Sequence, residues 1–140
     1  MRQIVRESWS TAQREALKRG LFRMRSASFF DAHEEFEGAW RAAAPDSPGR
    51  PVLKALAQLA ASHHQLVMGK GRAAVRTWHK ARGPLLTAGM IDPGFCAAMD
   101  ELHARAGVTA EGPRFIDPAR CGPPQSFPRL DDETLYTPSA

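Results

Sequence analysis

The sequence predicts an all-α protein, a compact bundle of four to five helices followed by a Pro-rich extended C-terminal tail. Apolar residues recur at spacings of three and four, which is typical of amphipathic helices. No stretch alternates with period two, and β-branched residues are sparse, which argues against strands. A hydrophobic content of 43% is typical of a globular chain. The 140 residues suit one domain, which we expect in residues 1–110, with the tail in residues 111–140.

The first helix is predicted from about Trp9 to Met24, where apolar residues share one face. Ser10 and Gln13 have the spacing of a capping box, in which each side chain bonds the other residue's backbone N–H. Gly20 weakens the middle of this segment, so the helix either ends there or continues with a defect.

The second helix is predicted from Ser28 to about Ala43, because Ser28 followed by Asp31 fits the first turn of a helix. The following stretch "APDSPGRP" contains three prolines and a glycine, which we expect to stop the helix. The third helix is then predicted from Val52 to Met68, ending at Gly69.

The fourth helix is predicted from Arg72 to Arg82, with Gly83 and Pro84 as a break. A further helix is predicted from Asp92 and Pro93 to Gly107, because Asp is a favourable N-cap and Pro a favourable first helical residue.

The stretch "FFDAHEEFEGAWR", residues 29–41, concentrates the polar residues of interest. His33 and Glu37 are one turn apart, so both should lie at the edge of the core and within reach of each other. On the third helix, His64 falls inside the apolar arc and His63 on its border, so His64 is predicted to point at the core. A short loop implies that the two helices are antiparallel neighbours, which would bring His33, Glu37 and His64 to one end of the pair.

These stretches resemble a known family. "FFDAHEEFEGAWR" together with "LAQLAASHHQLVMGKGRAA" is similar to the two motifs of the domain of unknown function 309 family, over about residues 20–82. The resemblance implies a small all-helical bundle without an established activity. It also implies that six positions belong to one motif cluster: His33, Glu34, Glu37, Trp40, Gln58 and His64.

Three interpretations of this cluster remain open. It is a polar network that fixes the register of the helices, a divalent metal site formed by His33, Glu37 and His64 with water, or a His–Glu pair for general base catalysis. Ser62 is the nearest hydroxyl, but adjacent helical positions point different ways. The first interpretation is favoured, so no demonstrable enzymatic activity and no cofactor other than a divalent metal are expected.

An interaction role would rest on the fourth helix, where Arg72, Arg76 and Lys80 repeat every four residues. Such a row contacts phosphates in an adaptor or a nucleic-acid-associated protein, but it is more often the solvated side of a helix. No nucleic-acid-binding motif accompanies it, so nucleic acid is not the expected partner. Trp78 is predicted to pack in the core.

The remaining features concern the cellular setting. The net charge is +4, which bears on solubility more than on function. Cys96 and Cys121 form no CxxC pair, as in reduced cytosolic proteins. No apolar run approaches the roughly 20 residues of a membrane helix. We therefore expect a small cytoplasmic protein with no membrane partner, and assembly into a homo-oligomer is left open.

Overall fold

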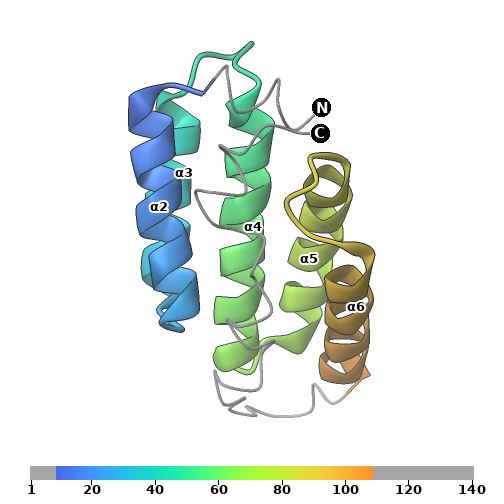
Figure 1. Ribbon diagram of the computed structural model, residues 1–140. Helices are drawn as coiled ribbons and strands as arrows, with labels where there is room; N and C mark the ends of the chain where they lie inside the picture. Colours follow the sequence, from blue (N-terminus) through green and yellow to red (C-terminus); the bar gives the residue numbers. More distant parts are fainter. Residues whose placement is uncertain (1–8, 109–140) are drawn as a thin grey trace.

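The computed structural model describes residues 9–108, which form five α-helices and, within this range, no strand (Figure 1). The all-α prediction is therefore confirmed. The tail predicted at residues 111–140 lies outside the described residues, so its boundary with the bundle stays a prediction. The helices are α2 (Thr11–Arg25), α3 (Phe29–Ala42), α4 (Gly49–Val67), α5 (Gly71–Thr87) and α6 (Pro93–Val108).

Each helix packs against the next one in the chain, and α2 also touches α4. In Figure 1, α4 stands at the centre, with α2 and α3 on one side of it and α5 and α6 on the other. Because α4 is covered from both sides, most of its side chains are buried. It supplies much of the apolar core, including the fully buried Leu53, Leu56, Leu59 and Leu66.

Two predicted helix starts are confirmed by hydrogen bonds. The Gln13 N–H donates to Ser10 Oγ at 3.1 Å, and the Ser10 N–H donates to Gln13 Oε1 at 2.9 Å, which completes the capping box of α2. At α6, Asp92 Oδ1 accepts from the Phe95 N–H at 2.7 Å. Ser28 occupies the N-cap position of α3, but its side chain makes no capping hydrogen bond.

Two predicted helix boundaries are wrong, and both involve proline. The helix α4 begins at Gly49, so Pro51 lies in its first turn, where a missing N–H removes no intrahelical hydrogen bond. The helix α5 continues through Gly83 and Pro84 to Thr87. Leu85, just beyond the proline, is fully buried, so packing of the last turn against the core outweighs the lost backbone hydrogen bond.

Gly20 does not end α2, which continues to Arg25. Its missing side chain instead leaves room for the ring of Phe36 on α3, which packs directly over it. The turns after α2, α4 and α5 each contain one residue with a left-handed backbone: Ala27, Gly69 and Gly89. No helix in residues 9–108 combines the length and the apolar character needed to cross a bilayer.

Candidate functional site

His33, Glu37 and Arg41 form a row of polar side chains along one edge of α3. His33 Nε2 lies 3.5 Å from Glu37 Oε2, and Glu37 Oε1 lies 3.6 Å from Arg41 Nε. One-turn spacing brings these side chains together, as the sequence indicates. Glu34 is more exposed, with its carboxylate 3.8 Å from His33 Nδ1. Glu37 therefore contacts His33 on one side and anchors Arg41 on the other.

The prediction for the histidines of α4 is wrong. His63 is fully buried, whereas His64 is partly exposed. His63 packs against the Phe29 ring at 5.0 Å between centroids, and its Nδ1 lies 3.0 Å from the carbonyl oxygen of Leu59. The prediction assumed that this helix has a single buried face. It is wrong because the central helix α4 is buried on more than one side, including the side that carries His63.

The ring of Phe30 stands beside both partly exposed histidines. Its centroid is 6.4 Å from that of His33 and 5.4 Å from that of His64. Across residues 9–106, no three His, Cys, Asp or Glu side chains are placed so that they could hold a metal ion. The structure thus pairs His33 with Glu37 but does not assemble them with His64 into a ligand set.

Neither Ser62 nor Gln58 completes a catalytic arrangement. The Ser62 hydroxyl is buried and donates to the carbonyl oxygen of Leu59 at 2.8 Å, so it is turned to its own helix backbone. Gln58 is partly exposed on α4, and no hydrogen bond of its side chain appears among the described residues.

The strongest concentration of charge lies at the other end of the motif, around Trp40. Arg41 Cζ lies 5.4 Å from the centroid of the Trp40 ring, Arg50 Cζ lies 5.9 Å from it, and Lys54 Nζ lies 5.4 Å from it. Trp40 and Arg41 come from the end of α3, and Arg50 and Lys54 from the start of α4. We call these four residues the Trp40 cluster. Three cations from two helices thus meet on one indole, each within cation–π range.

The charges of the Trp40 cluster are poorly balanced. Glu37 is the carboxylate that contacts it, through Arg41. Arg50 and Lys54 form no ion pair with any residue between 9 and 106. The indole N–H of Trp40 and the Nε–H of Arg50 are also buried there, and neither finds a hydrogen-bond acceptor among residues 9–106. Buried donors usually have partners, so the cluster offers positive charge and hydrogen-bond donors in excess.

A second polar cluster joins α5 to α6 and centres on Asp100. Its Oδ1 accepts from Trp78 Nε1 at 2.7 Å and from Arg82 Nε at 2.9 Å, and its Oδ2 accepts from Arg82 Nη2 at 2.7 Å. The bidentate geometry is the strong form of an Arg–carboxylate pair. We call Trp78, Arg82, Cys96, Asp100 and His103 the Asp100 cluster.

The pKa values in the Asp100 cluster follow from burial and hydrogen bonding. Burial raises the pKa of Asp100, but hydrogen bonds from Arg82 and Trp78 outweigh it, so the pKa lies below its ordinary value. The hydrogen bond to Asp100 raises the pKa of Arg82. Burial, followed by the charge of Asp100, raises the pKa of the Cys96 thiol. These shifts favour the ion pair and a neutral thiol.

His103 is the buried histidine of the Asp100 cluster. Its ring stacks on Trp78 at 5.5 Å between centroids and 15° between planes. Its Nδ1 lies 2.7 Å from the carbonyl oxygen of Met99, so this nitrogen carries the proton. Its Nε2 is buried and has no hydrogen-bond partner in the part of the chain that the structure describes. Burial lowers the pKa of His103, and the Met99 hydrogen bond offsets this only partly, which keeps the imidazole neutral.

The basic row predicted on the fourth helix lies on α5. Arg72, Arg76 and Lys80 are all exposed, and none of them forms an ion pair with another described residue. Trp78 of the same helix is fully buried, as predicted.

The sequence analysis missed both clusters, although each left a signal. Cys96, Asp100 and His103 are spaced by four and three residues, and Trp78 and Arg82 by four, so each set shares one helix face. Similarly, Arg50 and Lys54 are one turn apart, directly after the loop that brings α4 back to Trp40. The sequence does not show which other helix each of these faces packs against.

Comparison with known families gives a match that includes α3 and α4. Residues 17–77 match the model of the family described as Domain of unknown function (DUF309). This part of the chain belongs to that family. The match covers α3 and α4 with the Trp40 cluster, but it ends before the first residue of the Asp100 cluster, Trp78. No curated protein and no solved structure matches the chain significantly. The family description assigns no activity, so function has to be argued from the site.

Proposed function

We propose that the protein is a binding module that captures an anionic group, preferably a phosphate, at the Trp40 cluster. The observation that carries the proposal is the convergence of Arg41, Arg50 and Lys54 on one indole, within 6 Å of its centroid. Three positive charges around one ring repel one another, and a bound anion relieves the repulsion. Arg guanidinium groups also offer paired N–H donors that match phosphate oxygens.

The position of the cluster strengthens this proposal. Arg50 is the second residue of α4, whose first turn contains no acidic side chain and whose N-cap residue, Pro48, makes no side-chain capping bond. Pro51 has no N–H, and the Arg50 N–H donates to the carbonyl oxygen of Ser47 at 3.1 Å, so it is the helix dipole at this end that favours a negative charge. The cations and the helix start therefore attract the same kind of ligand from adjacent positions.

An anion fits this face better than a metal ion or a catalytic dyad. The His33–Glu37 pair supplies two ligands, and no third His, Cys, Asp or Glu among residues 9–106 completes the set. Structural zinc sites use four ligands and catalytic ones three plus water. The row from His33 to Arg41 instead acts as a support, because Glu37 holds Arg41 on the side of the helix where Trp40 lies.

Titration calorimetry at low ionic strength tests the proposal, with inorganic pyrophosphate as the probe. The double variant Arg50→Gln/Lys54→Gln should weaken binding by at least about tenfold, since each hydrogen bond to a charged group contributes roughly 1.5–3 kcal/mol. The matched control is Arg76→Gln/Lys80→Gln, which removes the same charge from the exposed face of α5 and should bind as the parent does. Equal losses in both variants, or no binding by the parent protein, would refute the proposal.

A further inference from the structure

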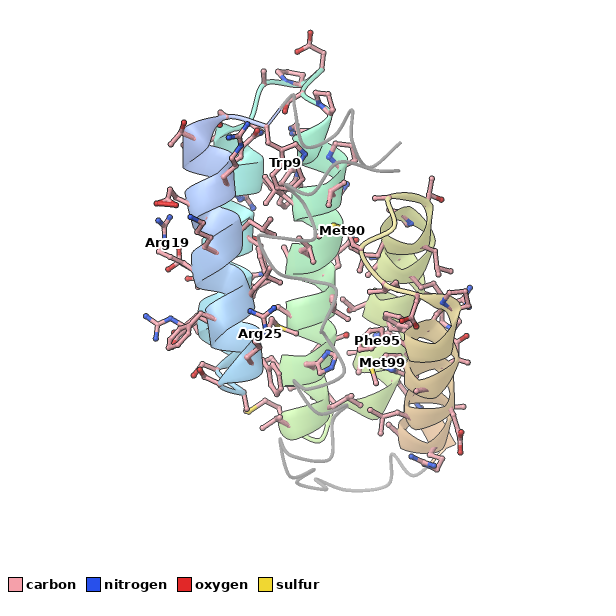
Figure 2. The ribbon with its side chains drawn as sticks, in the orientation of Figure 1. Trp9, Arg19, Arg25, Met90, Phe95 and Met99 are labelled. Atoms are coloured by element: carbon pink, nitrogen blue, oxygen red, sulfur yellow. The ribbon has the colours of Figure 1, made fainter. Side chains whose placement is uncertain are left out.

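One end of the bundle is both apolar and basic at its surface. This end, which we call the turn end, comprises residues 22–31 and 68–72, where the α2–α3 and α4–α5 turns lie (Figure 1). Figure 2 shows Arg25 at this end of α2 and Trp9 at the opposite end of the bundle. The turn end is therefore separate from the Trp40 cluster, which lies where α3 ends and α4 begins.

The large hydrophobic side chains that the described residues expose all belong to the turn end. Phe22 is 63% exposed, and Phe30 and Met68 are each 53% exposed. They come from three different helices or helix ends, within about one turn of the same end. A single exposed hydrophobic residue needs no explanation, but the concentration of all three at one end indicates an interaction surface.

The same end carries an excess of positive charge. Arg23, Arg25, Lys70 and Arg72 are exposed there, against one exposed carboxylate, Asp31. In the adjoining last turn of α6, Arg105 is paired with Glu101 at 3.0 Å, so it does not alter this balance. The turn end thus combines three exposed apolar side chains with a net charge of +3, counted as four basic residues minus one acidic residue.

We propose that the turn end docks on an anionic lipid surface. Large apolar side chains that enter the headgroup region and basic side chains that contact lipid phosphates are the two components of peripheral membrane binding. Docking of this kind needs no helix that crosses the bilayer. The expectation of no membrane partner was based on apolar run length, which does not test this mode of binding.

Other occupants fit the turn end less well. A second copy of the chain docked through the same surface would place four basic residues against four basic residues, which opposes a two-fold dimer. A nucleic acid would use the cations, but it would leave Phe22, Phe30 and Met68 without an apolar environment. A lipid surface satisfies both components.

Co-sedimentation with lipid vesicles tests the proposal. The full chain should bind vesicles that contain about one third phosphatidylglycerol, and binding to pure phosphatidylcholine should be much weaker, since each basic residue contributes about fivefold at an anionic surface. Added salt should weaken the binding. Binding of equal strength to both kinds of vesicle, or to neither, would overturn the proposal.

Two sets of variants separate the components. The triple variant Phe22→Ser/Phe30→Ser/Met68→Ser and the charge variant Arg23→Gln/Lys70→Gln/Arg72→Gln should each lose binding by about tenfold or more. All six side chains are exposed, so melting temperatures should stay close to that of the parent. The control Arg76→Gln/Lys80→Gln, which removes charge from the exposed face of α5, should bind vesicles as the parent does. Retained binding in both turn-end variants, loss of binding in the control, or a dimer that the triple variant dissociates, would refute lipid docking.

Discussion

The contact between Gly20 and Phe36 allows a sharp test of how α2 and α3 pack. A Cβ atom placed on Gly20 would overlap three ring atoms of Phe36, with Cδ1 only 2.7 Å away. Phe36 is fully buried, so its ring cannot swing into solvent to make room. The substitution Gly20→Ala therefore has to separate the two helices or force the ring from its rotamer.

The expected size of this effect follows from two opposing contributions. Alanine is favoured over glycine in a helix interior by about 1 kcal/mol. Overpacking of a dense core typically costs about 1–3 kcal/mol, and the short distances to Phe36 place Gly20→Ala near the upper limit. The net result is a decrease of about 2 kcal/mol in the free energy of unfolding. For a domain of this size, such a decrease lowers the melting temperature by roughly 8–16 °C.

Thermal and urea unfolding followed by circular dichroism measure this effect, and Gly38→Ala is the matched control. Gly38 lies within α3, and an added Cβ there meets no atom within 4 Å. The control should raise stability by up to about 1 kcal/mol. Phe36→Leu should rescue part of the loss in a double variant, because it shortens the side chain that opposes the new methyl group. A Gly20→Ala protein as stable as Gly38→Ala would refute the packing of Phe36 over Gly20.

Three further predictions concern the polar residues. Burial lowers the pKa of His103 in the folded protein, so the unfolded chain binds the proton first as the pH falls. The free energy of unfolding should therefore decrease below about pH 6.5. Urea titrations between neutral and mildly acidic pH should show this slope, and His103→Leu should reduce it. Asp100→Asn should lower stability by about 1 kcal/mol, since the carboxylate binds Trp78 and Arg82 but is 38% exposed and screened by solvent; an unchanged urea midpoint would contradict this. Elemental analysis of untagged protein should find no stoichiometric metal, and chelators should leave the melting temperature unchanged, because no three-ligand group exists among residues 9–106.

Local sequence signals predicted the helices well where a side chain acts on its own backbone. The capping box at Ser10 and the N-cap at Asp92 depend on residues three positions apart, so they can be recognised without the rest of the fold. The predicted break at Pro84 is wrong because it depends on contacts distant in the sequence. Its local preference is to end the helix, but the burial of Leu85 one residue later decides the outcome, and that burial depends on the other helices.

The same distinction explains the candidate site. The spacing of His33 and Glu37 is a property of one helix and was read from the sequence, whereas the exchange of roles between His63 and His64 depends on what surrounds α4. The Trp40 cluster also requires two helices, because Arg50 and Lys54 reach the indole from α4. Sequence periodicity identifies faces, and only the packed structure shows which faces meet.

The most direct test of the anion-binding proposal uses the three tryptophans of the chain, Trp9, Trp40 and Trp78. Each contributes one indole N–H signal to a ¹⁵N–¹H spectrum, and Trp40→Phe assigns the signal of the cluster. The account predicts that inorganic pyrophosphate shifts the Trp40 signal in a saturable manner and leaves that of the buried, hydrogen-bonded Trp78 unchanged. A Trp40 signal that does not move, or that moves no more than the Trp78 signal, would contradict it.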